Sequence, residues 1–269
     1  MIDIDRKISL SRTHDGRVAR LCMTSPDNLN AMDDGMAAAF RQALAHLQDQ
    51  PLRALVISGQ GRAFSAGGDL AMLRAKADKS QETNQREMLE FYQSFLGLRD
   101  LATPLVVALQ GHAVGAGFCF AAACDLRLAD TSAQFAAPFT RLGLHPGMGG
   151  SFFLPRSLGS EPARDLMLTG RRMGAEEALR LGFLSRLVEP QGLEAALEEA
   201  LTGILAGAPL ATRALLRSQR EAEREPLQRC LEREAVEQAE CYARPEFLEG
   251  VEALATRRPP RWDDATSPS

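Results

Sequence analysis

Two short apolar runs, each leading directly into a glycine-rich loop, do most to constrain the fold of this chain. The run 53–58 has the length and β-branched content of a buried strand, and it ends in Gly59-Gln-Gly61. A second such strand, 104–109, leads into a loop that contains Gly115-Ala-Gly117 and then into a helix of small residues over 118–124. Strand, loop and helix in succession predict an α/β protein whose strand-end loops carry the chemistry.

Weaker periodic patterns predict the other elements of the α/β part. Segments 7–12 and 17–23 flank the turn Asp15-Gly16 and predict a hairpin. Apolar residues spaced at helical intervals over 36–47 predict a helix that Asp33 or Asp34 can cap. Short strands are predicted at 125–129 and 183–188, and the intervening helices are expected to end at Gly159, Gly170 and Gly182.

The pattern changes near residue 193. From there the sequence predicts consecutive helices with no strand between them, over 193–206, 209–222, 226–243 and 245–256. We therefore divide the chain into a core over 1–192, a helical region over 193–262, and a polar tail over 263–269 that we expect to be disordered. A helical region of this kind packs across its own subunit, a neighbour, or both.

Composition excludes several classes of protein. The chain has 31 basic and 35 acidic side chains, a net charge of −4, and no basic run, so a nucleic-acid-binding surface is not indicated. The longest apolar stretch, 113–124, is too short to span a bilayer, and the N-terminus lacks the apolar segment of a secretory signal. Five cysteines without a C-x-x-C pair indicate neither a zinc site nor a disulfide framework. We expect a cytoplasmic protein that binds no metal.

The glycine loops point to a specific kind of chemistry. Gly67-Gly68 follows a strand, and Gly115-Ala-Gly117 follows another strand and opens a helix, so both can present backbone amides to an anion. Two such loops that converge form an oxyanion hole, which a reaction needs when charge gathers on a carbonyl oxygen. Neither loop matches a dinucleotide or P-loop motif. A serine-hydrolase reading fails, because no histidine follows His145.

Together these segments resemble the crotonase superfamily, the enoyl-CoA hydratase and isomerase group. The resemblance covers nearly the whole chain and rests on five motifs: Leu29-Asn-Ala-Met32, Arg62-Ala-Phe-Ser-Ala-Gly-Gly-Asp-Leu70, Gln110-Gly-His-Ala-Val-Gly-Ala-Gly117, Cys124-Asp-Leu-Arg-Leu128 and Leu142-Gly-Leu-His-Pro-Gly147. It implies a spiral of ββα units followed by a C-terminal helical trimerisation region. It also implies a homotrimer, or a hexamer built from two trimers.

The same resemblance assigns the site. The backbone amides of Ala66 and Ala116 match the two oxyanion donors that bind the thioester oxygen of an acyl-CoA. Residues Ala66, Gly67, Gly68 and Asp69 match the stretch that lies along the CoA arm. CoA is then part of the substrate, and no separate cofactor is expected.

The two glutamates that hydratases of this family use are missing. Their positions map to Cys119 and Phe139, which by the same resemblance border the acyl group. Phenylalanine has no proton to move, and a cysteine among phenylalanines and alanines is a neutral thiol. Isomerases that work with one glutamate use the second position. Efficient two-glutamate hydration and ordinary isomerisation are therefore both disfavoured.

Several side chains remain as replacements, each with a plain structural alternative. His145 can exchange protons near neutral pH, or can be a packed imidazole before a turn. The side chain of His112 is expected to point away from the ligand. Glu82, Glu87 and Glu90 can reach into the acyl pocket, or can form a solvated helix face; Asp125 is expected to hold backbone or an arginine. The cations that can meet CoA phosphates are Arg62, Arg74, Lys76 and Lys79.

Four functions stay open. The chain can be an enzyme that uses an oxyanion-stabilised enolate without two-glutamate hydration, and decarboxylation of a malonyl-type thioester is one such reaction. It can instead be a thioesterase, an unconventional hydratase or isomerase, or a non-catalytic acyl-CoA binder. We expect an enzyme of the lyase or isomerase type.

Overall fold

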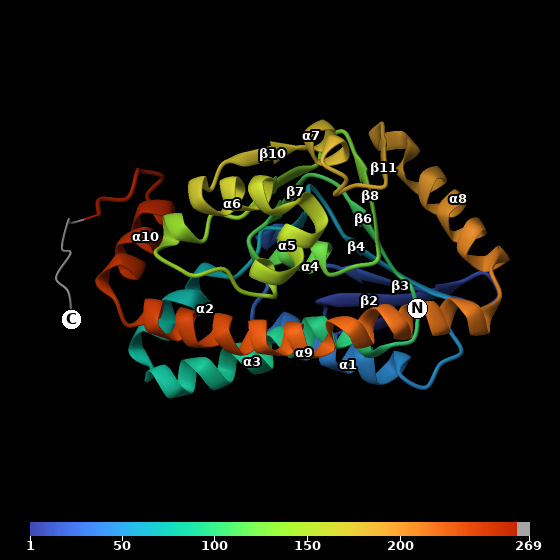
Figure 1. Cartoon of the computed structure of the whole chain (residues 1–269), viewed down its shortest axis with the longest axis horizontal. Helices are drawn as coiled ribbons and strands as arrows, with labels where there is room; N and C mark the ends of the chain where they lie inside the picture. Colours follow the sequence, from blue (N-terminus) through green and yellow to red (C-terminus); the bar gives the residue numbers. More distant parts are fainter. Residues whose placement is uncertain (263–269) are drawn as a thin grey trace.

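The computed structural model describes residues 1–262, so the predicted tail 263–269 lies outside the described residues (Figure 1). Its strands are β1 (Ile2–Ile4), β2 (Ile8–Thr13), β3 (Val18–Met23), β4 (Ala54–Gly59), β5 (Ala63–Ser65), β6 (Leu105–Leu109), β7 (His112–Val114), β8 (Leu126–Asp130), β9 (Gln134–Ala136), β10 (Arg172–Gly174) and β11 (Arg186–Val188). Its helices are α1 (Asp34–Leu47), α2 (Leu70–Ala75), α3 (Gln81–Leu96), α4 (Ala116–Ala122), α5 (Gly150–Leu158), α6 (Ser160–Thr169), α7 (Ala175–Arg180), α8 (Leu193–Ala206), α9 (Pro209–Tyr242) and α10 (Pro245–Ala255).

The strands form two sheets that the chain visits alternately. The larger sheet has the order β1-β2-β3-β4-β6-β8-β11, and the smaller has the order β10-β9-β7-β5. In three successive units the first strand (β4, β6 or β8) joins the larger sheet, the second (β5, β7 or β9) joins the smaller one, and a helix follows. Within each sheet the strands of these three units are parallel to one another. This arrangement confirms the predicted α/β fold and its spiral of ββα units.

The N-terminal hairpin is present as predicted, since β2 and β3 pair antiparallel from Ile8 with Met23 to Thr13 with Val18. The strand predicted over 183–188 is shorter than expected, because only Arg186–Val188 pairs with β8. The Phe183 ring packs instead against Phe118 and Phe135 in the core. The three-residue strands β1, β5, β7, β9 and β10 were not predicted, since three residues are too few to show an alternating pattern.

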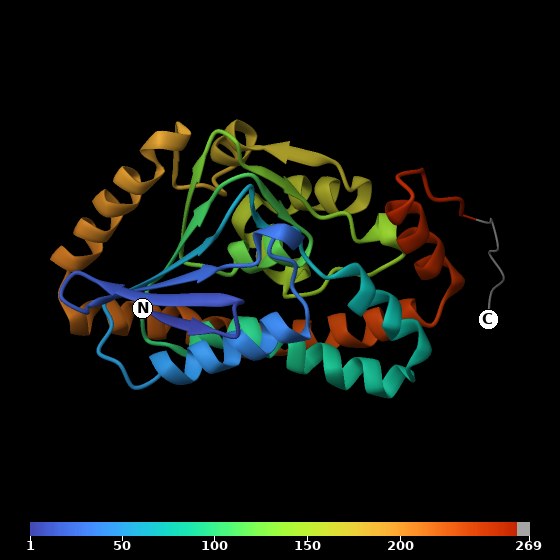
Figure 2. The same ribbon diagram turned by 180° about the vertical axis from the view of Figure 1, so that it is seen from behind.

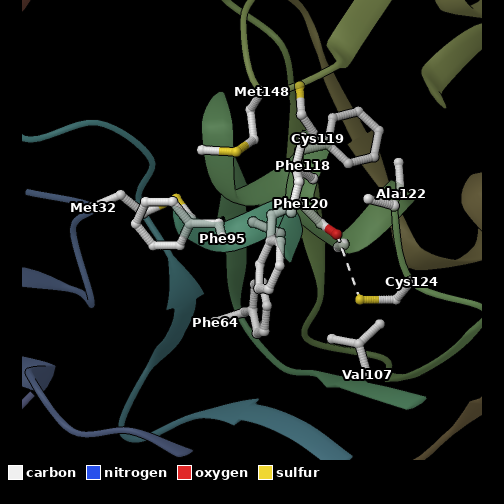
Figure 3. Packing of buried hydrophobic residues seen from close by; sticks show 14 of the residues in the cluster. Met32, Phe64, Phe95, Val107, Phe118, Cys119, Phe120, Ala122, Cys124 and Met148 are labelled. Atoms are coloured by element: carbon white, nitrogen blue, oxygen red, sulfur yellow. Dashed lines mark hydrogen bonds between the residues drawn. The ribbon is translucent and has the colours of Figure 1, made fainter. Parts of the chain in front are cut away.

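Helix α4 runs through the centre of the hydrophobic core (Figure 3). Phe118 and Phe120 are fully buried and lie about 200° apart around the helix, so they pack in different directions. Phe120 contacts the rings of Phe40, Phe64 and Phe95, whereas Phe118 contacts those of Phe135 and Phe183. Because α4 begins at Ala116, this packing fixes the second glycine loop.

A second, smaller core lies under α8, at the start of the predicted helical region. Residues on one face of four neighbouring strands, β3, β4, β6 and β8, meet buried residues of α8: Val18, Val56, Val106 and Leu128 on the sheet, and Ala196, Leu197 and Leu201 on the helix. The predicted boundary at residue 193 therefore coincides with the first residue of α8, but this helix covers the outer face of the large sheet.

The prediction of separate helices over 209–222 and 226–243 is wrong. They form one helix, α9, which contains Pro226 in its interior and runs alongside α3 (Figures 1 and 2). Proline removes one helical hydrogen bond, to the carbonyl of Ala222. Ala222 is exposed, so water can hydrate that carbonyl, and the sequence around it is rich in strong helix formers such as Glu, Arg and Leu.

Polar contacts hold α9 to the core on both sides of Pro226, through Arg220 before it and Glu234 after it. Asp125 accepts hydrogen bonds from the Leu105 amide and from Arg220 of α9, both at 2.7 Å to the same carboxylate oxygen. This confirms the structural role predicted for Asp125. Within residues 1–262, no helix has the combination of length and apolar character needed to cross a membrane.

Candidate active site

The two glycine loops meet at one point. Gly67 has a φ of +88°, which favours glycine, and a Cβ atom there would lie 2.5 Å from the Val114 carbonyl oxygen and 3.3 Å from the Ala116 nitrogen. Only a residue without a side chain lets the first loop approach the second so closely. The convergence predicted from sequence is therefore present.

The amide that the first loop offers is not the predicted one. The Ala66 N–H donates to the Leu29 carbonyl at 2.9 Å, so it is not free to bind a ligand. Gly68 forms a parallel bridge with Met32, in which the Gly67 carbonyl and the Asp69 amide make the hydrogen bonds. In such a bridge the N–H of Gly68 points to the opposite side. It has no acceptor among the described residues, so the free amide of this loop is that of Gly68 rather than Ala66.

The second loop offers the amide that the sequence predicted. Ala116 is the first residue of α4, and Gly115 before it has a φ of +54°. An N–H at this position has no acceptor within its helix and lies at the positive end of the helix dipole. The alanine methyl is accommodated because the residue has ordinary helical geometry.

Both loops line a cavity of about 610 Å³. Its wall is mostly apolar and comes from the two loops, α2, α3, the segment after β9, and the C-terminal helices. The polar residues among those that line it are Asn28, Asp69, Tyr92, Gln238, Tyr242 and Arg257. A cavity of this size with two free amides in its wall suits a small apolar ligand that carries one carbonyl oxygen.

Comparisons with known proteins show which family the chain belongs to. A family model described as enoyl-CoA hydratase/isomerase matches residues 13–265. The chain belongs to this family. A Mycobacterium tuberculosis protein named "Probable enoyl-CoA hydratase" is 38% identical over 185 residues, which cover 68% of this chain and 71% of that protein.

Two further comparisons extend over most of the chain. The carnitinyl-CoA dehydratase of Salmonella arizonae is 33% identical over 264 residues, 94% of this chain and 98% of that protein. A crystal structure of an enoyl-CoA hydratase/isomerase from Pseudoalteromonas atlantica superposes with a TM-score of 0.84 at 31% identity, covering 96% of this chain and all of that one. The family assignment predicted from the motifs is thus confirmed.

The positions of the two family glutamates differ in their relation to the cavity. Phe139 lines it, and its ring reaches to 3.8 Å from where a Cβ of Gly115 would be, beside the oxyanion loop. Cys119 is fully buried and is not among the cavity-lining residues, contrary to its predicted place in the substrate site. Burial raises the pKa of the Cys119 thiol well above its ordinary value. Neither residue can supply a carboxylate.

His145 does not take the place of the missing glutamates in this structure. Its side chain does not line the cavity, and its Nδ1 lies 2.7 Å from the Pro146 carbonyl oxygen. The acid–base role predicted for His145 therefore has no geometric support. Its backbone carbonyl accepts a hydrogen bond at 2.7 Å from Gln238, which does line the cavity. His112 lies in β7 and is also outside the lining.

The glutamates predicted after the first loop belong to α3 and do not reach the cavity. Glu87 forms ion pairs with Lys76 at 2.6 Å and Lys79 at 2.7 Å. Burial raises the pKa of Glu87, but the hydrogen bonds from the two lysines outweigh burial and leave this pKa below its ordinary value. Glu82 and Glu90 are exposed on the same helix. The alternative of a solvated helix face fits these residues.

Three residues predicted to contact the ligand have other partners. The Asp69 carboxylate caps α2 by accepting from the Met72 amide at 2.9 Å, although Asp69 does line the cavity. Lys76 is buried and forms its ion pair with Glu87, and Arg74 lies 3.6 Å from Glu252. Arg62 is exposed and is not part of the cavity wall. The cation that does line the cavity is Arg257, just after α10, which was not among the cations predicted to meet CoA phosphates.

Sequence reasoning also missed Glu234, a fully buried carboxyl group on α9. It accepts from the Gly149 and Ser151 amides, each at 2.8 Å, and from the Ser151 hydroxyl at 2.7 Å, at the start of α5. Burial outweighs these hydrogen bonds and raises the pKa of Glu234 to about 7. Glu234 is not in the cavity wall, so it holds the segment 149–151 rather than reaching a ligand.

Proposed function

We propose that this chain is an acyl-CoA enzyme that binds the thioester oxygen between the amides of Gly68 and Ala116 and stabilises an enolate. The observation that carries the proposal is a pair of backbone N–H groups in the wall of an apolar cavity, neither of which has an acceptor within residues 1–262. A thioester α-carbon gives up a proton or a carboxyl group only if the resulting oxyanion is stabilised. Preorganised amides do this without reorganisation, and removing one donor typically costs about 3 kcal/mol of transition-state stabilisation.

Ordinary two-carboxylate hydration is not part of this proposal. Among the residues that line the cavity, Asp69 is the one carboxylate, and it is engaged in capping α2. Hydration requires a group that activates water and a group that delivers a proton. Each missing acid–base group typically lowers a rate by about 10² to 10⁴.

Decarboxylation of a malonyl-type thioester is the reaction that a cavity wall without a free carboxylate favours. Its C–C bond breaks, CO2 leaves, and the electron pair moves onto the thioester oxygen as an enolate, so no base is needed. The α-carbon then takes up one proton from water. Tyr92 and Tyr242 line the cavity, but both hydroxyl groups donate to the Gln238 Oε1 atom.

A panel of thioesters tests the proposal. Binding of acetyl-CoA and butyryl-CoA is measured by calorimetry, and turnover is followed with crotonyl-CoA, malonyl-CoA and methylmalonyl-CoA. We expect acyl-CoA binding, decarboxylation of a malonyl-type thioester, and hydration of crotonyl-CoA orders of magnitude below that of a two-glutamate hydratase. Hydration at the usual rate of such a hydratase, or no binding of any acyl-CoA, contradicts the proposal. Binding without turnover of any thioester identifies a non-catalytic binder.

A further inference from the structure

We infer that Glu234 of α9 is a positioning residue for the proposed acyl-CoA site, because it fixes the turn that puts Gly147 and Met148 into the cavity wall. The inference rests on the proposed function, since the ligand concerned is the thioester bound in that cavity. Glu234 itself lies outside the wall, so it acts through the turn and not by touching the ligand.

The turn 147–150 has a backbone conformation that is unfavourable for one of its residues. Met148 has a φ of +59° and Gly149 a φ of +71°, so two successive residues lie in the left-handed region. Glycine adopts this region readily, whereas a residue with a side chain, such as Met148, does not. Strain of this kind persists only where surrounding contacts hold it, and it often occurs at functional sites. The position of Met148 therefore depends on contacts from outside the turn.

Glu234 holds the end of the turn. Its carboxyl group is fully buried and accepts from the Gly149 and Ser151 amides, each at 2.8 Å, and from the Ser151 hydroxyl at 2.7 Å. The Gly149 N–H belongs to the planar peptide unit that joins Met148 to Gly149. A hydrogen bond to this N–H therefore fixes the orientation of the unit that carries Met148.

Gln238 holds the beginning of the same segment. It lies one helical turn beyond Glu234 on α9 and donates to the His145 carbonyl at 2.7 Å. Gly147 and Met148 lie between these two contacts, and both line the cavity. Space is tight here, because a Cβ atom on Gly147 would lie 2.7 Å from the Gln238 Nε2 atom. A shift of the turn thus changes the shape of the wall.

The strength of the contact at Glu234 depends on the charge of its carboxyl group. Both amides bonded to it can only donate, and a hydrogen bond to an ionised acceptor is roughly twice as strong as one to a neutral acceptor. Since burial raises the pKa of Glu234 to about 7, the turn is held more firmly as the pH rises through 7. This local effect is separate from the stability of the whole chain, which also depends on the protons bound by the unfolded state.

Other groups that interact electrostatically with Glu234 do not change charge near neutral pH. They are a thiol on the same helix, a thiol on α4 and a phenol on α3: Cys230, Cys119 and Tyr92. Burial raises the pKa of all three, that of Cys230 to about 11, so they stay protonated. Arg156 on α5 stays positively charged. The His145 ring can gain a proton, so the wild type is compared with variants that keep this histidine.

Glu234→Gln tests the inference, because glutamine keeps the shape of the side chain and cannot ionise. Binding of butyryl-CoA to the full chain is measured by calorimetry at pH 6, 7 and 8. We expect the ratio of wild-type to variant affinity to rise about 3- to 10-fold from pH 6 to pH 8. The ratio cancels the titration of the CoA phosphates and of His145, which both proteins share.

Two further variants separate positioning from a general effect on folding. Ser151→Ala removes one donor that favours the ionised carboxyl group, so the pH midpoint of the affinity change should move to a higher value. Glu240→Gln, at an exposed position on α9, is the matched control and should follow the wild type at every pH. Thermal unfolding at each pH verifies that every variant is folded. If Glu234→Gln does not fold, the midpoints of the wild type and Ser151→Ala decide the question.

The outcomes distinguish this inference from the proposed function. If butyryl-CoA binds and the affinity ratio does not change with pH, the inference is overturned and the proposed function stands. The same holds if Ser151→Ala leaves the midpoint unchanged, or if Glu240→Gln behaves like Glu234→Gln. If no acyl-CoA binds to the wild type, both are overturned.

Discussion

Ala116 is the first residue of α4, where an amide hydrogen has no acceptor within the helix. A proline at such a position keeps the helix intact, because its fixed φ suits the first turn and the N–H it lacks was unpaired. Ala116 therefore offers a way to remove one hydrogen-bond donor of the site and leave the element that carries it unchanged.

We predict that Ala116→Pro lowers kcat/KM for any thioester that the protein turns over by about 10² to 10³, with little change in the free energy of unfolding. Ala175→Pro is the matched control, because Ala175 is the first residue of α7, also follows a glycine, and does not line the cavity. Turnover and denaturant unfolding are measured on both. Full activity in Ala116→Pro would rule out this amide as an oxyanion donor.

Residue-level reasoning from sequence found the right loops but chose one wrong amide. The motif places Ala66 and Gly68 two residues apart, and either N–H can face a ligand. The choice depends on the bridge between Met32 and Gly68 and on the Leu29 carbonyl, which occupies the Ala66 amide. Those contacts come from a different segment of the chain, so the loop sequence does not encode them.

Glu234 connects two helices, because it joins α9 to the first turn of α5. Its pKa in the folded chain is raised to about 7 from an ordinary value of 4.5. A carboxyl group with a raised pKa contributes stability that is fully present below pH 4.5 and is lost as the pH rises to about 7. Between these values the unfolded chain releases a proton that the folded chain retains.

We predict that the wild type loses up to about 3 kcal/mol of unfolding free energy between pH 4.5 and 7 through this group. Glu234→Gln cannot ionise, so the difference in stability between variant and wild type should change over this pH interval and be constant above it. Urea unfolding at a series of pH values measures both. A difference that does not vary with pH would show that Glu234 titrates normally.

Pro226 affects the stability of a single helix, α9. It interrupts the hydrogen bonds of α9 without ending the helix. We predict that Pro226→Ala raises the free energy of unfolding by about 1–3 kcal/mol. Pro209→Ala, at the first position of the same helix, is the control and should bring no gain. A loss of stability in Pro226→Ala would mean that the proline is required where it stands.

Sequence patterns predicted the elements that have periodic burial and missed those that depend on partners. The helix capped by Asp33 and the strands β2, β3, β4 and β6 show clear periodicity or continuous apolar runs, and they were found. The end of a helix expected before Pro226 followed from local helix propensity alone. Tertiary contacts on both sides, through Arg220 and Glu234, override that propensity.

At the scale of the whole molecule, assembly remains a prediction from the family resemblance. Apolar side chains on α9 are consistent with a partner surface, since Leu210 is 69% and Leu215 58% exposed in the single chain. We predict a trimer, or a hexamer of two trimers, at micromolar concentration. Mass photometry measures it, and Leu210→Glu with Leu215→Glu tests whether this surface takes part. A stable monomer of the wild type would contradict the prediction.

The cavity wall combines stretches from the beginning, the middle and the end of the chain. Leu29 and Gly68 come from early segments, whereas Gln238 and Leu254 come from the last two helices and Arg257 follows them. Until α10 has been synthesised, the cavity lacks the part of its wall that comes from this helix and from Arg257. A ligand that needs the whole of this wall can therefore stabilise the finished chain, and we do not expect it to stabilise early folding intermediates.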